Sequence, residues 1–171
     1  MRKICYGVAM SLDGYIAGPS GEADWIVADP EIDFVAMFAK YDTLVMGRKT
    51  FERMAEAGRA SVPGMKIVVF SKTLRASEYP DATIVADKLE ETVAGLRAAP
   101  GKDIWLFGGG ALFRSFLERG LVDTVEVGLI PVLLGKAIPL LPPPAKTESL
   151  ELVSHHIYKQ SGIVMLTYAL K

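Results

Sequence analysis

The stretch from residue 103 to residue 119 constrains the fold of this chain more than any other. The apolar run Ile104–Phe107 is typical of a buried strand, three glycines follow at once, and residues 111–119 have the spacing of an amphipathic helix. A strand that turns through glycines into a helix presents free backbone N–H groups and the positive end of the helix dipole at one point. Such a point favours an anion, typically a phosphate. A tight strand-to-helix turn that binds no ligand could have the same sequence. Evidence for an anion site must therefore come from the rest of the chain.

The rest of the chain repeats this alternation of strands and helices. Predicted strands cover residues 2–10, 43–46, 65–70, 83–85, 104–107 and 124–130, and predicted helices cover residues 29–40, 47–54, 87–97 and 111–119. Alternation of this kind is typical of a mostly parallel sheet with helices on both faces. Residues 150–158 and 163–170 alternate strongly and predict an antiparallel β-hairpin. We therefore expect one domain over residues 1–171, with an α/β fold of three layers (α/β/α), a mixed, mostly parallel sheet and a C-terminal hairpin.

The first predicted helix begins at Asp29-Pro30-Glu31, where an N-cap aspartate precedes a proline at the first helical position. Its apolar residues occupy two sides of the helix up to Lys40. Because the helix is apolar most of the way round, we expect it to be well buried.

Polar or glycine-rich turns follow four of the predicted strands, at Ser11–Gly14, Gly47–Thr50, Ser71–Thr73 and Gly108–Gly110. Open α/β sheets bind ligands beyond the carboxyl ends of their strands, so these turns predict a binding rim. Arg48 and Lys49 are unfavourable at a helix N-terminus unless an anion is present, although an exposed cation pair is the alternative. Lys72 suggests a second phosphate position, as a dinucleotide with a ribose 2′-phosphate requires. Neither a P-loop nor the Rossmann glycine pattern occurs.

Composition excludes several classes of protein. The chain has 19 basic and 20 acidic residues, which argues against a nucleic-acid surface, and no apolar run reaches the length of a membrane span. A lone cysteine, Cys5, fits a reducing cytoplasm, and we expect it to be a small buried strand residue rather than a nucleophile. His155 and His156 are neighbours on a strand and point to opposite faces, so we expect no metal site there.

Four motifs together resemble the dihydrofolate reductase superfamily, and most closely its branch with the C-terminal reductase domain of the riboflavin biosynthesis protein. They are Met10-Ser11-Leu12-Asp13-Gly14-Tyr15-Ile16-Ala17, Val45-Met46-Gly47-Arg48-Lys49-Thr50-Phe51, Phe107-Gly108-Gly109-Gly110 and Ile130-Pro131-Val132-Leu133-Leu134-Gly135-Lys136. The motifs occur in order across nearly the whole chain. Each alone is weak, and the set is specific.

The resemblance implies an oxidoreductase that uses NADPH. By analogy the pyrophosphate and 2′-phosphate would be held at the turn of Gly47, Arg48, Lys49 and Thr50. Ser71 and Lys72 would meet the 2′-phosphate end of the adenosine, and the central pyrophosphate would lie along Gly108, Gly109, Gly110, Ala111 and Leu112. Ile16 and Ala17 would border the nicotinamide. The superfamily also implies a cis peptide bond, expected here between Gly108 and Gly109.

The sequence determines the residues that would contact the substrate less clearly than those that would bind the cofactor. Folate enzymes carry a carboxylate on the first helix, and the matching residue is Glu31, with Asp33 also open; both could instead be first-turn acids that complement the helix dipole. Asp13, with Ser11, matches a loop that approaches the substrate, as a proton relay or a sugar-hydroxyl ligand, although an Asp-Gly turn has local reasons of its own. Trp25 would cover a flat heterocycle or simply pack.

The leading hypothesis is a cytoplasmic NADPH-dependent reductase that passes a hydride to a small heterocyclic substrate, pterin-like or aminopyrimidine-like. Catalytic candidates are Asp13 and Glu31, and substrate candidates are Ser11, Trp25 and Asp33. Two alternatives stay open: a non-catalytic NADP(H)-binding module, and the riboflavin-pathway reduction of a ribosylaminopyrimidine phosphate. Relatives of the riboflavin type also imply a homodimer, with the terminal hairpin as a contact.

Overall fold

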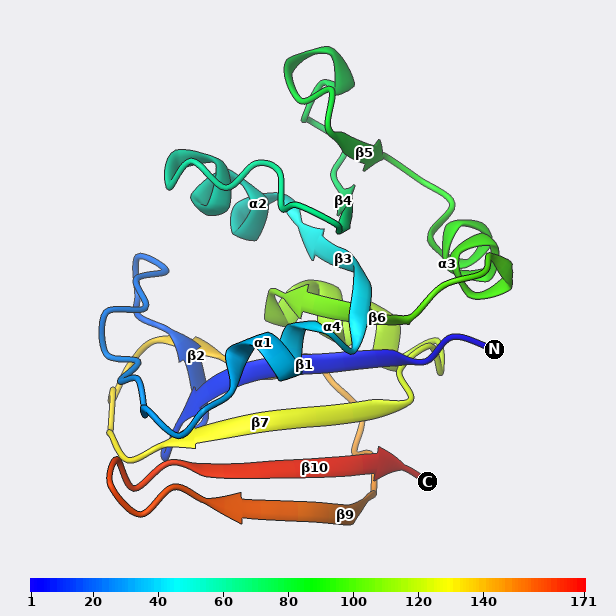
Figure 1. The fold of residues 1–171 in the computed structure, drawn as a ribbon. Coiled ribbons are helices and arrows are strands. Elements are labelled where there is room, and N and C mark those ends of the chain that lie inside the picture. The colour runs from blue at the N-terminus through cyan, green and yellow to red at the C-terminus, as the bar shows by residue number, and fades with distance from the viewer.

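A computed structural model describes residues 1–171 and contains a central sheet of eight strands. The order across the sheet is β5-β4-β3-β6-β1-β7-β10-β9, which can be followed from top to bottom in Figure 1. The strands are β1 (Ile4–Ser11), β3 (Tyr41–Gly47), β4 (Lys66–Phe70), β5 (Ala82–Val85), β6 (Asp103–Gly108), β7 (Thr124–Ile130), β9 (Leu150–Ile157) and β10 (Val164–Leu170). Neighbours from β5 to β7 are parallel, and β10 pairs antiparallel with both β7 and β9. The predicted mixed, mostly parallel sheet with a terminal hairpin is confirmed.

Helices cover both faces of this sheet and make the three expected layers. They are α1 (Phe34–Phe38), α2 (Arg48–Glu56), α3 (Leu89–Ala98) and α4 (Gly110–Leu117), with a 3₁₀ turn, η1, at Ala76–Glu78. The core on one face includes residues of α3 and α4, and the core on the other includes Phe51 of α2 with Met37 of α1 packed against it. None of these helices has the length and apolar character to cross a membrane.

A second, two-stranded sheet lies outside the central one. It pairs β2 (Tyr15–Ala17) with β8 (Ile138–Pro139) in antiparallel fashion. Cys5 of β1 is only 3% exposed, and burial raises the pKa of its thiol to about 11, as expected for an inert strand residue.

The expectation of a long, buried helix over residues 29–40 is wrong. The α-helix begins only after Asp33, whose carboxylate accepts a hydrogen bond from the Ala36 N–H at 2.8 Å and is the N-cap. Asp29 instead uses its carboxylate to accept the N–H of Ser161, in the turn of the terminal hairpin, at 3.0 Å. None of the residues of α1 is buried, and Val35 is 81% exposed. The short helix is too small to turn all its apolar residues toward the sheet.

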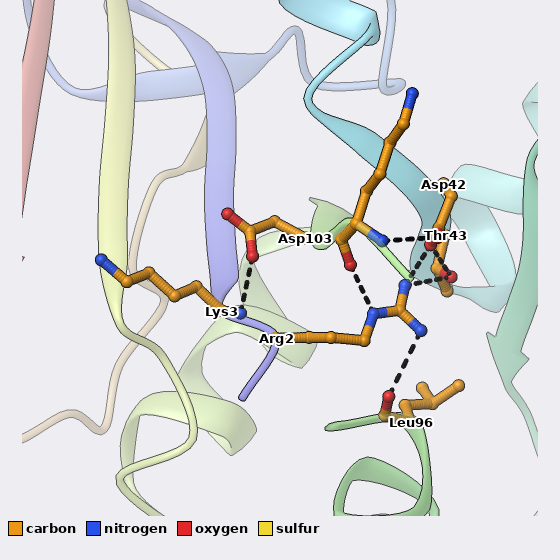
Figure 2. A network of polar contacts seen from close by, with 7 residues as sticks. Arg2, Lys3, Asp42, Thr43, Leu96 and Asp103 are labelled. Carbon is orange, nitrogen blue, oxygen red and sulfur yellow. Dashed lines mark hydrogen bonds and ion pairs between the residues drawn. The ribbon is translucent and has the colours of Figure 1, made fainter. Parts of the chain in front are cut away.

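A buried arginine, Arg2, forms hydrogen bonds with residues near the amino ends of β3 and β6, at the edge of the sheet opposite the predicted binding rim. Arg2 is 8% exposed, and its guanidinium donates to the carbonyls of Lys102 and Leu96, to the Thr43 hydroxyl and to the Asp42 carboxylate (Figure 2). Asp42 also accepts the Lys102 N–H at 2.7 Å. One cation therefore joins the start of β1 to β3, to α3 and to the turn before β6, with its polar atoms satisfied.

We predict that Asp42→Asn lowers the free energy of unfolding by about 2 kcal/mol. The new side-chain NH₂ group would face the Arg2 guanidinium or the Lys102 N–H, which are also donors. Thermal unfolding should begin about 6 °C lower. Partial burial raises the pKa of Asp42, but the Lys102 N–H, the Thr43 hydroxyl and Arg2 outweigh it and hold the pKa below its usual value. The stability difference between the two proteins should therefore be complete at pH 7 and shrink below about pH 4, as the native carboxylate is protonated. A difference that stays constant down to pH 2 would contradict this assignment.

Candidate cofactor-binding site

The four turns singled out in the sequence lie next to one another. Strands β4, β3, β6 and β1 are consecutive in the sheet and parallel, so their carboxyl ends meet at one rim. Along this rim the turns follow in the order Ser71–Thr73, Gly47–Thr50, Gly108–Gly110 and Ser11–Gly14. Residues from four distant parts of the sequence therefore form one continuous edge, as the alternation of strands and helices predicted.

Two helix N-termini open side by side on this edge. The N-cap residues of α2 and α4 are Gly47 and Gly109, and no side chain caps either helix. The two turns are in contact, because a Cβ atom on Gly109 would lie 3.5 Å from the Thr50 hydroxyl. The first N–H groups of both helices therefore have no partner within their helices, and both dipoles present their positive ends at one place. The peptide bond between Gly108 and Gly109 is cis, as the resemblance implied.

The N-terminus of α4 also carries the small second sheet. A Cβ atom on Gly110 would lie 2.8 Å from the carbonyl oxygen of Pro139 and 2.9 Å from that of Leu140, so only glycine allows this chain crossing. Pro139 belongs to β8 and pairs with Tyr15 of β2, the strand that also contains Ile16 and Ala17. Strand β8 therefore lies between the strand of the candidate nicotinamide-bordering residues and the candidate pyrophosphate turn.

Two of the three cations of the rim have carboxylate partners on the protein. Arg48 donates through Nη1 to both oxygens of Glu52, at 3.0 and 2.9 Å, one helical turn further along α2. Lys72 forms an ion pair of 3.4 Å with Asp87, and both side chains are more than 70% exposed. Lys49 is exposed and has no ion-pair partner. Exposed ion pairs of this kind are worth little, so an incoming phosphate can replace the carboxylates at small cost.

Ser71 has a structural role in the turn after β4. Its side chain is buried, and its hydroxyl oxygen accepts the N–H groups of Thr73 and Leu74 at 3.2 and 3.1 Å. The hydroxyl therefore shapes the turn after β4. A cavity of about 400 Å³ lies beside this turn, between the carboxyl ends of β4 and β5 and the start of α3. Its charged lining consists of Lys72, Asp87, Lys88, Glu90 and Arg119.

Asp13 and Ser11 form a clamp at the carboxyl end of β1. The buried Ser11 hydroxyl donates to Asp13 Oδ1 at 2.6 Å, and the same carboxylate accepts the N–H groups of Leu134 and Gly135 at 3.1 and 2.7 Å. The Ser11 hydrogen bond, with the backbone bonds of Gly135 and Leu134, lowers the pKa of Asp13. The clamp brings together two motifs that lie about 120 residues apart in the sequence. Neither motif alone indicates that their residues are hydrogen-bonded to each other.

Among the remaining acids, Glu31 and Asp33 have different surroundings. Asp33 caps α1, so its carboxylate is occupied. Glu31 is exposed, and its side chain has no hydrogen-bond or ion-pair partner. Trp25 is half-buried and donates through Nε1 to the Glu22 carbonyl at 3.3 Å. The structure thus separates one free carboxylate from one that stabilises the helix.

The sequence did not reveal the role of Asp29. Its buried carboxylate accepts from Ser161 and from the Glu31 N–H, and these bonds, led by that of the Ser161 side chain, lower its pKa. Asp29 looked like a helix cap because Asp-Pro-Glu is a local capping pattern. Its partner comes 132 residues later in the chain, so no local signal could have identified it.

Comparison with known proteins agrees with this geometry. The RibD C-terminal domain family matches residues 2–164. The uncharacterized protein YyaP of Bacillus subtilis is 33% identical over 98% of this chain and 94% of its own. A crystal structure from Shewanella sp. PV-4, provisionally named a riboflavin biosynthesis protein, is 30% identical, covers 100% of this chain and 99% of its own, and has a TM-score of 0.82. Dihydrofolate reductase from Enterococcus faecalis, in complex with NADP(H), is 18% identical, with a TM-score of 0.72 over 99% of this chain and 96% of its own.

The strand order and these matches define the class of protein, an α/β domain with the dihydrofolate-reductase fold. The chain belongs to the RibD C-terminal domain family. The resemblance carried by the four sequence motifs is confirmed.

We predict that Asp13→Asn loosens the 132–135 loop, because one oxygen that accepts backbone N–H groups becomes a donor. Amide hydrogen exchange of Leu134 and Gly135 should become faster than in the wild type, with exchange in the core of β1 unchanged. In the wild type the clamp is intact above the ordinary pKa of aspartate and opens as the pH falls through the lowered pKa of Asp13. Equal exchange in both proteins would show that the carboxylate does not hold the loop.

Proposed function

We propose that this protein is a cytoplasmic NADPH-dependent reductase that transfers a hydride to a small heterocyclic substrate of the pterin or aminopyrimidine type. The observation that carries the proposal is the pair of uncapped helix N-termini, α2 and α4, that open side by side on a rim with three cations. The fold shared with a reductase that binds NADP(H) supports it.

The residues present fit a dinucleotide. A pyrophosphate needs several N–H donors and a backbone that lets it approach closely, and the turns at Gly47 and Gly108–Gly110 provide both. Arg48, Lys49 and Thr50 would hold the pyrophosphate and the 2′-phosphate, with Ala111 and Leu112 in the first turn of α4. Lys72 would meet the adenosine end beside the 400 Å³ cavity, while Ser71 shapes that turn.

At the other end of the rim, Ile16 and Ala17 of β2 would border the nicotinamide. NADPH, when bound, supplies the hydride. The chain's part is to position the substrate, to exclude water and to deliver a proton. Glu31 is better suited than Asp13 to exchange a proton, because Asp13 accepts four hydrogen bonds from its neighbours and its pKa is lowered. Ser11, Trp25 and Asp33 would then shape the substrate side rather than react.

The experiment that tests the proposal is a titration with NADPH and NADH, followed by a screen for NADPH oxidation. The screen offers dihydrofolate, pterins, flavins and aminopyrimidines, including ribosylaminopyrimidine phosphates. Tight NADPH binding with no oxidation of any of them would favour a non-catalytic NADP(H)-binding module. No binding of NADPH would contradict the whole proposal.

We predict that Arg48→Ala weakens NADPH binding about tenfold and NADH binding much less, because charge-assisted hydrogen bonds to a phosphate are lost. Conversely, Glu52→Gln removes the carboxylate that Arg48 binds and should tighten NADPH binding. Fluorescence titration measures both, and Arg59→Ala, an exposed arginine beyond the end of α2, is the matched control. Equal losses for the two nucleotides would assign Arg48 to the pyrophosphate alone.

We also propose that the protein is a homodimer through its terminal hairpin. Strand β9 is at the edge of the sheet, and all eight of its residues are exposed. Leu150, Leu152 and Ile157 lie opposite Leu170, Tyr168 and Val164 of β10 and therefore share one apolar face with them. An exposed apolar edge strand is a ready surface for a second copy of the chain.

Leu152→Asp should therefore convert a dimer into a monomer, because a charge replaces an apolar contact at the centre of this face. Light scattering coupled to size exclusion gives the molecular mass of both proteins. Val35→Asp changes an even more exposed apolar residue, on α1, and should leave the mass unchanged. A monomeric wild type would refute the dimer.

A further inference from the structure

Asp29 is a buried carboxylate to which the proposed reaction gives no role. The residue is 2% exposed, and none of the ion pairs of the protein includes it. Burial of a charge without a cation is costly unless hydrogen bonds replace those of water. The groups that bind its two oxygens therefore account for its presence in the interior.

The two oxygens of Asp29 bind two different segments of the chain. Oδ1 accepts the Glu31 N–H at 2.9 Å, and Oδ2 accepts the Ser161 N–H at 3.0 Å. The Ser161 side chain is the first of the groups that lower the pKa of Asp29, so the carboxylate is charged at neutral pH and only accepts hydrogen bonds. Asp29 therefore connects Glu31 to the turn between β9 and β10, residues 158–163, which we call the hairpin turn.

The backbone of Glu31 lies in a short turn that is fixed on both sides. Before it, the Asp29 carbonyl accepts the Ile32 N–H at 3.1 Å, and Pro30 has a φ restricted by its ring. After it, Asp33 caps α1. The Glu31 side chain is exposed and has no hydrogen-bond or ion-pair partner of its own. The place of its carboxylate therefore depends on where Asp29 holds the turn.

The hairpin turn lies at the end of the candidate site that contains the turn Ser11–Gly14. A Cβ atom on Gly162 would lie 3.4 Å from Cγ of Pro131, the residue that follows β7. The carbonyl of the next residue, Val132, accepts the Leu12 N–H at 2.9 Å. Figure 1 shows the hairpin turn at the same end of the sheet as the carboxyl end of β7. Two contacts therefore connect the hairpin turn to the carboxyl end of β1.

We propose that Asp29 is a positioning residue that holds Glu31 at this end of the rim by binding it to the hairpin turn. The inference rests on the proposed function, because it takes Glu31 as the residue that exchanges a proton with the substrate. Asp29 itself does not contact the reacting atoms, since both of its oxygens are occupied. The terminal hairpin thereby takes part in the reaction although it contributes no reacting group.

Two substitutions open the connection without changing the cofactor turns. In Asp29→Asn the amide has a single acceptor oxygen, so it cannot accept from both N–H groups, and its NH₂ group faces a donor. In Asp29→Ser the hydroxyl can accept only one of the two N–H groups. Asp24→Asn is the matched control, because it changes an exposed acid of the same segment.

A first experiment tests the connection without any cofactor. Amide hydrogen exchange is measured for Glu31 and Ser161 in the wild type and in the variants. Both substitutions of Asp29 should raise exchange at one or both of these amides and leave the cores of β1 and β7 as they were. The control should match the wild type. Unchanged exchange at both amides would overturn the proposal.

A second experiment measures oxidation of NADPH with the pterin or aminopyrimidine that the wild type reduces in the screen. Glu31→Gln should lower kcat about a hundredfold, because the group that exchanges the proton is lost. Asp29→Asn should lower kcat about tenfold, because the same group is displaced. The double variant should be as slow as Glu31→Gln alone, since no carboxylate is left to position. The KM for NADPH should be the same in all four proteins.

The outcomes separate this inference from the proposed function. A double variant about tenfold slower than Glu31→Gln would show that the two residues act independently, which refutes positioning and leaves the reductase intact. A raised KM for NADPH in Asp29→Asn would assign the loss to a general disturbance of the fold and refute positioning as well. A wild type that binds NADPH but reduces none of the compounds contradicts the proposed function, and with it the role of Asp29.

Discussion

The parallel hydrogen-bonded ladder of β4, β3, β6 and β1 is the constraint on which the rest of the structure depends. Because the four strands are parallel and adjacent, each one ends at the same rim and each turn lies next to another. The helices that follow β3 and β6 must then begin side by side. Their free N–H groups and dipoles add at one place, which no single strand–glycine–helix unit achieves.

The positive groups at this rim are partly balanced by carboxylates of the protein itself. Two helix N-termini and three cations would repel one another if nothing neutralised them. Glu52 and Asp87 supply that neutralisation through exposed ion pairs, which are weak enough to exchange for a phosphate. At the opposite end of the sheet the positive charge is buried rather than exposed. There Arg2 is buried, its partners are permanent, and the arrangement serves stability.

Local patterns predicted the elements whose structure depends on neighbours in the sequence. The strands of the central sheet, the glycine turns and the terminal hairpin are of this kind, and they were predicted to within a few residues. The helix over residues 29–40 failed because two aspartates four residues apart both resemble a cap. In the folded protein Asp29 binds the distant residue Ser161, and Asp33 is the residue that caps the helix. The same holds for Asp13, whose short local turn with Ser11 was visible while its bonds to residues 134 and 135 were not.

The sequence by itself determined the fold class, the family and the residue types of the rim, since periodicity, glycine spacing and motif order are all one-dimensional properties. The tertiary structure alone decided which of these groups are free and which are occupied. It paired Arg48 with Glu52, enclosed the Ser71 hydroxyl, made Asp13 a clamp and left Glu31 unpaired. It also placed the Arg53 guanidinium against the Ser20 carbonyl. Hydrogen bonds between residues far apart in the chain depend on distances and directions that exist only after folding.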